Sequence, residues 1–347
     1  MDFRGSIALA RASGLGPLPR IFGERTSERQ LWRALEQAGL PVDIVSDPNL
    51  PIPTYAMVGL FERCARLLGD RTFGLDVGFA METDWGYGTW GQYGWRSATL
   101  GEAIQRYNRT VWAHTVGGGI DLLQHQNSWL WRSFGPSFSR SSIQHADHLL
   151  GPMIIVARRY LGKDWMPEWV EVSYPRDPQA HLLEDRLQVP ILFDRRGTGI
   201  AIRSEDLQAG PFRHALLSAD DLPLRAVLAE GVLQAAEEPA RSLSAIVALR
   251  LLDGHTDIEG TARLVGIGVQ GLQRRLRERG YTYREIVEAA RRERAMSLLR
   301  ETDLSVLEIA LTLGYQDHAS FTRAFRHWVG CAPTAYRFRY RPTRKAG

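Results

Sequence analysis

Two short stretches in the C-terminal third of this 347-residue sequence carry polar and basic side chains at matching positions. Arginine can form two hydrogen bonds at once with the edge of a guanine, and glutamine can do the same with adenine. In both stretches these side chains alternate with apolar residues four positions apart, which places them on the exposed face of an amphipathic helix. The candidate contact residues are Gln270, Gln273, Arg274 and Arg277 in the first stretch, and His318, Thr322, Arg323 and Arg326 in the second.

The surrounding sequence predicts the elements that position these side chains. Residues 257–280 align with residues 305–330. In each copy a short helix contains an alanine, a glycine follows four residues later, and the next helix carries two large apolar residues. Glycine permits the positive φ that the turn between the helices needs. This is the helix-turn-helix pattern, present twice. The residues that define it are Ala262, Gly266, Leu272 and Leu276, then Ala310, Gly314, Phe321 and Phe325.

A further helix, expected over residues 283–299, joins the two copies. At 1.5 Å per residue it spans about 25 Å, so with the thickness of the flanking helices the two basic helices come to lie about 34 Å apart, one turn of B-form DNA. The alternative interpretation is that the basic residues only solvate the helix surfaces. Two such helices in register, with matching turns, favour the interpretation that the basic residues contact two successive major grooves.

Charge is distributed unevenly along the chain. Residues 241–347 hold 19 Lys+Arg and 11 Asp+Glu, a net charge of +8, whereas residues 1–240 carry a net charge of −4. The basic third is therefore the part expected to meet a polyanion. Charge alone would also fit an acidic membrane surface. Separately, no apolar run approaches the roughly 18 residues of a membrane span, which argues against an integral membrane protein.

The composition narrows the class of protein further. With 44% hydrophobic and 24% charged residues the sequence is typical of a soluble globular protein. The first residues lack the apolar core of a signal peptide. Cys64 and Cys331 are the only cysteines, too few for a disulfide framework or a thiolate metal site. We therefore expect a cytoplasmic protein with no metal, no cofactor and no membrane partner.

The N-terminal part reads as helices mixed with scattered strands, which predicts an α+β domain of about 220 residues. Ser27 is expected to cap a helix that Gly39 and Pro41 end, and a second helix is expected from Tyr55 to Leu68, with Gly69 beyond its end. Two more helices are expected over residues 99–114 and 142–160. Strands are expected over residues 73–77, 120–125, 129–134, 170–173, 191–193 and 200–202.

The basic third resembles the DNA-binding domain of AraC/XylS-type bacterial transcription regulators. The densest match is ETDLSVLEIALTLGYQDHASFTRAFRHWVGCAPTAYR, residues 301–337, which ends in the family's pattern with Gly330, Pro333, Tyr336 and Arg337. The resemblance implies that Gln270, Gln273 and Arg274 read one groove, and His318, Thr322 and Arg323 the next.

The first copy departs from the family pattern at two positions. Gly268 stands where the family usually has Ser or Thr as the helix cap, and Gly271 lies inside the helix. A glycine cap costs little, but an interior glycine costs roughly 1 kcal/mol of helix stability relative to alanine. The first recognition helix is therefore expected to be looser and to order on DNA.

Residues from about 26 to 210 resemble the arabinose-binding-type N-terminal domain found in a subset of these regulators. The matching segments are Ile52-Pro53, ARLLGDRTFGLDVG at 65–78, SATLGEAI at 97–104 and VPILFD at 189–194. The resemblance implies a small-molecule sensor that also dimerises, without identifying arabinose as the ligand.

Together these observations predict an α+β sensor domain followed by an all-α domain with two helix-turn-helix units joined by a linking helix. The expected limits are a ligand-sensing and dimerisation domain at 1–225, a linker at 226–241 around Pro239, the DNA-binding domain at 242–341 and a basic tail at 342–347. The expected function is a ligand-responsive transcription activator. Its implied partners are double-stranded promoter DNA, a small-molecule effector, RNA polymerase and a second copy of the chain.

The sequence contains fewer indications of the effector site. Eight of the ten tryptophans lie between Trp85 and Trp169, and DWGYGTWGQYGW at 84–95 alternates aromatic rings with glycine. Such rings can line a cavity for an apolar, aromatic or cationic ligand, although ordinary core packing is the alternative. HADH at 145–148 has no second ligand group at metal spacing, so we expect a partly exposed helix there. The glycines at 117–119 are expected to form a turn. The candidate ligand-contact residues are Trp85, Tyr87, Trp90 and Trp95.

Two other functions stay open at this point. One is a regulator that acts constitutively, without a ligand. The other is an enzyme that the basic third targets to DNA, such as an alkyl transferase with a cysteine nucleophile. Neither Cys64 nor Cys331 has a histidine or acidic partner in its local sequence. We therefore expect no catalytic activity.

Overall fold

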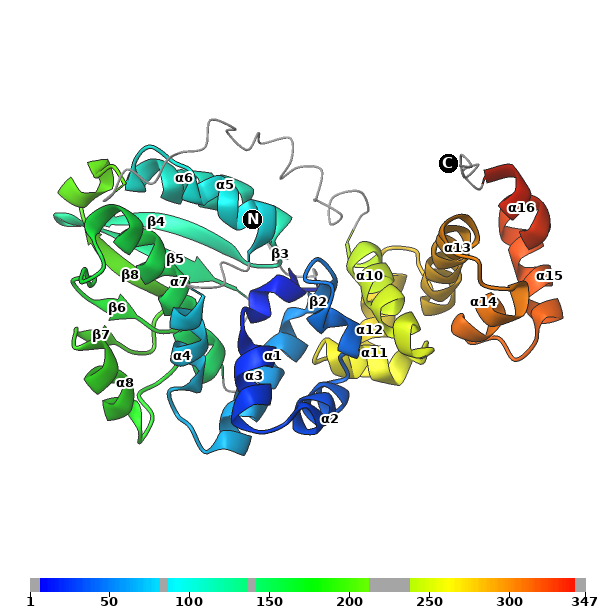
Figure 1. Cartoon of the computed structure of the whole chain (residues 1–347), viewed down its shortest axis with the longest axis horizontal. Helices are drawn as coiled ribbons and strands as arrows, with labels where there is room; N and C mark the ends of the chain where they lie inside the picture. The colour runs from blue at the N-terminus through cyan, green and yellow to red at the C-terminus, as the bar shows by residue number, and fades with distance from the viewer. Residues whose placement is uncertain (1–6, 82–86, 136–141, 212–237, 341–347) are drawn as a thin grey trace, which may run out of the picture. The chain divides into compact units, whose positions relative to one another are not determined.

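The computed structural model describes residues 7–81, 87–135, 142–211 and 238–340. The chain divides into two compact units, Met1–Ala235 and Ala236–Gly347 (Figure 1). Most of the expected linker, residues 226–237, and the expected basic tail at 342–347 lie outside the described residues. The domain limits at 225 and 242 therefore stay predictions.

The N-terminal unit contains two sheets. In the smaller one β1 (Leu9–Arg11) lies between β2 (Pro51–Pro53) and β3 (Thr115–Val116), with both pairs antiparallel. The larger sheet has the order β4-β5-β8-β6-β7, and only its β6–β7 pair is parallel. Its strands are β4 (Gly119–His125), β5 (Ser128–Phe134), β6 (Val170–Glu171), β7 (Ile191–Leu192) and β8 (Thr198–Arg203).

Helices pack around these sheets, with α6 against β4 and α7 against β8. Short 3-10 helices complete the unit: η1 (Ala12–Leu15), η2 (Val42–Val45), η3 (Val111–Ala113) and η4 (Glu205–Gln208). The helices are α1 (Leu18–Arg25), α2 (Glu28–Ala38), α3 (Thr54–Leu68), α4 (Phe73–Ala80), α5 (Gly88–Trp95), α6 (Leu100–Thr110), α7 (Ile143–Leu161) and α8 (Ala180–Leu187).

The structure confirms the helix ends that the sequence predicted at Ser27, Gly39 and Gly69. The Ser27 hydroxyl accepts a hydrogen bond from the Gln30 amide, and Gly39 and Gly69 end α2 and α3 in the left-handed conformation. The strands expected at 120–125, 129–134, 170–173, 191–193 and 200–202 correspond to β4 to β8.

The strand expected over residues 73–77 is wrong, because this segment forms helix α4. A short apolar run does not distinguish a buried strand from a buried helix. Gly74 and Gly78 favour the helix, because residues without a side chain let α4 pack directly against the backbone of α7. A Cβ at Gly74 would lie 2.0 Å from the carbonyl oxygen of Gln144.

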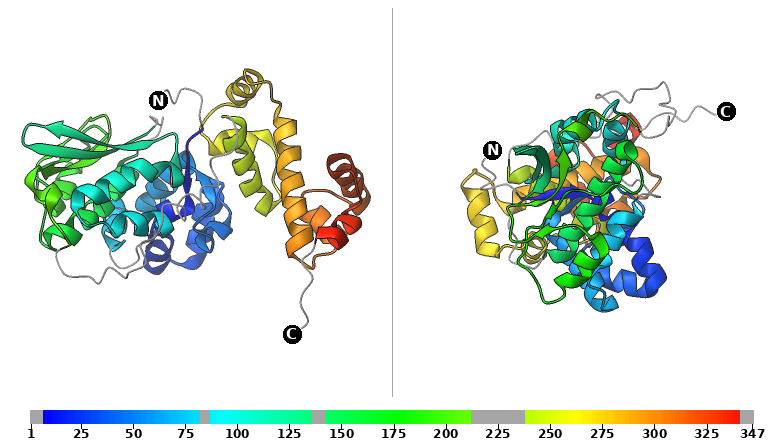
Figure 2. Two further views of the ribbon diagram at one scale, coloured as in Figure 1. Left: turned by 90° about the horizontal axis from the view of Figure 1, so that it is seen from above. Right: turned by 90° about the vertical axis from the view of Figure 1, so that its left-hand side faces the viewer.

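The described part of the C-terminal unit is entirely helical, which confirms the expected fold class. The linking helix α13 has 19 residues, so its rise is about 28 Å. Figure 2 shows it as one long helix between the yellow helices and the orange and red ones. The helices are α10 (Ala240–Arg250), α11 (Ile258–Leu264), α12 (Val269–Arg277), α13 (Tyr283–Glu301), α14 (Val306–Thr312), α15 (His318–Val329) and α16 (Pro333–Tyr340), with η5 (Leu251–Asp253) after α10.

Across the described residues, the search for a helix with the length and apolar character of a membrane span finds none.

Candidate nucleic-acid interface

The first helix-turn-helix unit, α11 and α12, is anchored by Arg250 from α10. This largely buried guanidinium donates to the Asp257 carboxylate at 2.6 Å and to the Thr261 hydroxyl at 3.1 Å. Asp257 also caps α11 by accepting from the Gly260 amide at 2.6 Å. Burial raises the pKa of Asp257, but the hydrogen bonds from Arg250 and Gly260 outweigh it and lower the pKa overall. Tyr283, at the start of α13, donates to the Asp257 carbonyl oxygen at 3.2 Å.

The recognition helix α12 presents its polar residues outward. Leu272 and Leu276 are fully buried against the unit, and the opposite face is exposed. Arg274 lies 3.8 Å from Glu278, one turn later on the same helix. The exposed residues include all four that the sequence predicted, Gln270, Gln273, Arg274 and Arg277.

The second helix-turn-helix unit, α14 and α15, has more complete caps than the first. Ser305 and Glu308 form a capping box at the start of α14, and Asp317 caps α15. Phe321 and Phe325 are fully buried, with ring centroids 5.7 Å apart. The opposite face carries the four predicted residues: His318, Arg323 and Arg326 are exposed, and Thr322 is half-buried.

Both predicted glycine turns are present. Gly266 has φ +70° and Gly314 has φ +76°, a conformation that side chains disfavour. Ala262 and Ala310, four residues earlier, are buried at the helix contact. The same turn geometry therefore sets the angle of the recognition helix in each unit.

The family ending at the C-terminus has an architectural role. Gly330 closes α15 with φ +80°, and Pro333 begins α16. Tyr336 packs edge-on against Phe325 at 5.5 Å. Arg337 donates to the carbonyl oxygens of Leu299 and Leu304, which fixes the end of α13 beside the start of α14.

Sequence reasoning missed the positioning roles of Arg250 and Arg291. Both arginines lie on helices flanking the recognition elements and bond to groups 7 to 35 residues away. Their side chains were indistinguishable from surface arginines in a basic segment. The aspartate cap at Asp257 gives the one local signal for Arg250, because a capping carboxylate can also accept a hydrogen bond from a guanidinium.

The predicted ligand-contact residues of the N-terminal unit lie within its packing, apart from Trp85, which is outside the described residues. Tyr87 and Trp90 are 9% and 7% exposed. Trp90 stacks on His114 at 4.8 Å and donates from Nε1 to the Thr110 hydroxyl at 3.1 Å. The guanidinium of Arg159 covers Trp95 at 4.7 Å. Tyr87, Trp90 and Trp95 therefore pack against other side chains of the unit, and their contact with a ligand stays a prediction.

The HADH segment is helical, but the expectation that it is partly exposed is wrong for three of its four residues: Ala146, Asp147 and His148 are buried, and only His145 is half-buried. Asp147 and His148 are fully buried in α7. Asp147 accepts hydrogen bonds from Arg71 and from the Tyr174 hydroxyl, each at 2.5 Å. Among the described residues no group of three His, Cys, Asp or Glu side chains is placed to hold a metal ion.

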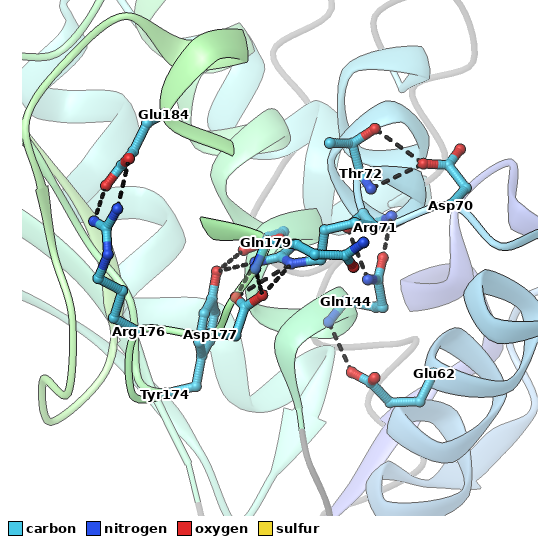
Figure 3. Close-up of polar contacts among 12 residues, drawn as sticks. Glu62, Asp70, Arg71, Thr72, Gln144, Tyr174, Arg176, Asp177, Gln179 and Glu184 are labelled. Carbon is cyan, nitrogen blue, oxygen red and sulfur yellow. Dashed lines mark hydrogen bonds and ion pairs between the residues drawn. The ribbon is translucent and has the colours of Figure 1, made fainter. Parts of the chain in front are cut away.

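Arg71 is the centre of this buried network. Figure 3 shows its side chain directed at Asp177, which accepts from Nη2 at 2.8 Å, and beside Tyr174, whose hydroxyl oxygen lies 3.1 Å from the same nitrogen. Gln144 donates to the Arg71 carbonyl oxygen and accepts from the Gly74 amide, which ties the start of α4 to α7. Since these polar groups satisfy one another, we interpret the network as structural.

Comparison with known proteins identifies both parts of the chain. Residues 30–210 match the model of the arabinose-binding domain of AraC transcription regulators, and residues 261–339 match a helix-turn-helix domain model. The ornithine utilization regulator of Pseudomonas aeruginosa is 25% identical over 301 residues, covering 85% of this chain and 87% of that protein. The transcriptional regulator VqsM of the same species is 40% identical over 85 residues, covering 24% of this chain and 26% of that protein.

A solved structure, the transcriptional regulator CdpR from Pseudomonas aeruginosa, covers 88% of this chain and 97% of its own, with a TM-score of 0.38 and 23% sequence identity. The ornithine utilization regulator and VqsM are both transcription regulators, which argues against the DNA-targeted enzyme. The chain belongs to the AraC-type family of DNA-binding transcription regulators, with an arabinose-binding-type domain before its two helix-turn-helix units.

Proposed function

We propose that this regulator reads promoter DNA by placing α12 and α15 in two successive major grooves. The observation that carries the proposal is the repeated recognition face, on which seven of the eight predicted contact residues are exposed and the eighth, Thr322, is half-buried. The rise of α13, about 28 Å, suits helices that enter grooves one turn of DNA apart.

The four arginines on these faces divide into two roles under this proposal. Arg274 and Arg323 occupy equivalent central positions and read base edges, where a bidentate contact with guanine is the favoured pairing. Arg277 and Arg326, one turn later, contact phosphates, which supply affinity without sequence information. This division gives each arginine a distinct signature in a binding experiment.

The test is binding of the full-length protein to its own upstream intergenic DNA and to a scrambled duplex, at two salt concentrations. Arg323→Ala should cost about 1–3 kcal/mol and relax specificity at one position, whereas Arg326→Ala should weaken binding to all sequences and reduce the salt slope by about one. Arg33→Ala, which removes an exposed charge from α2, is the matched control. Equal, steeply salt-sensitive binding to both duplexes would contradict sequence reading.

We also propose that a small molecule bound by the N-terminal unit controls DNA binding, and that the regulator activates transcription as a homodimer that contacts RNA polymerase. The support is the arabinose-binding-type domain, which spans residues 30–210. The mechanism would be a population shift, in which the effector favours the state whose paired C-terminal units grip adjacent sites. Tyr87, Trp90 and Trp95 remain our candidates for its contacts, together with Trp85. His114, which stacks on Trp90, adds a buried Nδ1 that has no hydrogen-bond partner among the described residues.

Ligand response can be tested with L-arabinose, L-ornithine and D-xylose, which the domain family and the names of relatives suggest as probes. The Kd for the operator is measured with and without each compound, and the oligomeric state is measured by sedimentation. A change in Kd with one compound that His114→Phe abolishes supports the sensor proposal. Operator binding that none of the three compounds changes favours the constitutive alternative.

A further inference from the structure

Arg323 is held in place on the recognition face of α15 by two residues of its own helix start. Its Nη2 donates to the Ser320 hydroxyl oxygen at 3.0 Å. The Ser320 hydroxyl donates its one proton to the Asp317 carboxylate at 2.8 Å, and the Ser320 amide donates to the other carboxylate oxygen at 2.7 Å. The three side chains therefore form an ordered series, Asp317 to Ser320 to Arg323, that fits the donors and acceptors each group has.

The carboxylate of Asp317 sets the direction of this series. Hydrogen bonds from the backbone and side chain of Ser320 lower the pKa of Asp317, so the group is ionised at neutral pH. An ionised carboxylate accepts only, which turns the Ser320 proton toward Asp317 and leaves a lone pair free to accept from Arg323. Asp317 thus acts both as the helix cap and as the group that orients the serine.

The first repeat provides an internal comparison. When the two units are aligned, Arg274 occupies the position of Arg323, while Gly268 and Gly271 occupy the positions of Asp317 and Ser320. Both groups that hold Arg323 are therefore missing around Arg274, which is drawn toward Glu278 instead, at 3.8 Å. The two recognition helices share a fold but differ in how their central arginine is held.

We propose that Ser320 is a positioning residue for Arg323, and that α15 in consequence discriminates sharply at one base pair whereas α12 makes adaptable contacts. An arginine that is already ordered loses less side-chain freedom when it binds, so more of its hydrogen-bond energy appears as preference for the correct base. This inference rests on the proposed function, because it requires that Arg323 and Arg274 contact bases.

Removal of the serine hydroxyl tests the first half of the proposal. The Kd of the full-length protein is measured for its own upstream DNA and for duplexes changed at one base pair at a time. Arg323→Ala identifies the base pair whose discrimination is lost. Ser320→Ala should reduce discrimination at that same base pair severalfold, out of the roughly tenfold or more that a bidentate arginine provides, and leave other base pairs unchanged. Ser320→Thr retains the hydroxyl and should restore it.

Construction of the series in α12 tests the second half. Side chains fit there, since a Cβ at Gly268 or Gly271 would meet nothing within 4 Å. Gly268→Asp with Gly271→Ser supplies both the cap and the hydroxyl. Gly268→Asp with Gly271→Ala supplies the cap and a better helix former without the hydroxyl, and is the matched control. Only the double variant with Gly271→Ser should sharpen discrimination at the base pair that Arg274→Ala identifies.

The outcomes separate this inference from the function on which it rests. If Arg323→Ala changes no base preference, the base-reading role proposed for Arg323 fails. If Arg323→Ala relaxes one base pair but Ser320→Ala does not, only the positioning role fails. Gly268→Asp with Gly271→Ala and Gly268→Asp with Gly271→Ser should not sharpen discrimination equally under this proposal. Equal sharpening would show that helix stability rather than the serine hydroxyl is responsible, and would overturn the proposal.

Discussion

Arg291, near the middle of the linking helix, donates a hydrogen bond from Nε to the carbonyl oxygen of Leu313, 3.0 Å away at the end of α14. The same guanidinium donates from Nη2 to the Thr256 hydroxyl at 3.2 Å, just before α11, and lies 4.9 Å from the ring of Tyr315. One side chain therefore contacts both helix-turn-helix units.

We predict that Arg291→Ala destabilises the C-terminal unit and weakens DNA binding although Arg291 lies outside both recognition helices. Loss of hydrogen bonds to a partly buried charged group removes about 1.5–3 kcal/mol. Urea unfolding of the full-length protein and operator titration measure the two effects. Arg292→Ala, at the exposed neighbouring position, is the control. Equal behaviour of the two variants would contradict the bridging role.

Glycine substitutions should have opposite signs at two positions in the first unit. A Cβ at Gly260 would lie 2.0 Å from Nη2 of Arg250, so Gly260→Ala must displace the guanidinium that holds Asp257. We expect a loss of about 1–3 kcal/mol from the broken buried contacts. A Cβ at Gly271 meets nothing, so Gly271→Ala should stabilise α12 by up to about 1 kcal/mol. The midpoints of urea unfolding of both variants give the signs directly.

The sequence predicted the elements whose ends carry local signals. Ser27 and Gly39 bound α2 as expected, and the turn glycines Gly266 and Gly314 define both helix-turn-helix units. Residues 73–77 were assigned wrongly because their apolar run has no helical period, and the contact of Gly74 with α7 lies 70 residues away in sequence. β1 to β3 were missed because strands of two or three residues, one of them with two prolines, leave no alternation to detect.

For the candidate site, the sequence likewise predicted only the features that depend on local spacing. The recognition faces follow from i,i+4 spacing within one helix, whereas the groups that hold them are distant or depend on side-chain conformation. Arg291 reaches a residue 35 positions away, and the bond from Arg323 to Ser320 depends on which way an exposed arginine turns. In the N-terminal unit, Arg71 meets residues 76 and 106 positions away, which no local pattern indicates.

The buried network around Arg71 should be sensitive to the removal of its one cation. Arg71→Met leaves the carboxylate of Asp147 buried without its charged partner, which typically costs about 3–5 kcal/mol. Asp147→Asn in the same chain removes the stranded charge and should recover part of this loss. Thermal unfolding of the two variants and of the single Asp147→Asn variant measures the coupling. A double variant no more stable than Arg71→Met would contradict a charge-based cause.

The stability of the N-terminal unit should fall as the pH drops from about 6.5 toward 4, because two buried histidines, His114 and His148, and the half-buried His145 are neutral in the folded state. Burial lowers the pKa of His114 and of His148 to about 3 and that of His145 to about 4. Unfolding exposes these imidazoles, which then bind protons below their ordinary pKa of about 6.5. The unfolded state binds more protons in this range, so the free energy of unfolding rises with pH by about 1.4 kcal/mol per unit for each histidine.

Asp147 contributes to the pH dependence of the free energy of unfolding with the opposite sign, by about one proton. Its burial raises the pKa of the carboxyl to about 6, so between about pH 4 and 6 the folded state holds a proton that the unfolded state releases. The net slope from these four groups is therefore about two protons near pH 5. Urea midpoints measured from pH 7 to 4.5 give this slope. His114→Phe should lower this slope by about one proton. A slope equal to that of the unaltered protein would show that His114 is not the group titrating on unfolding.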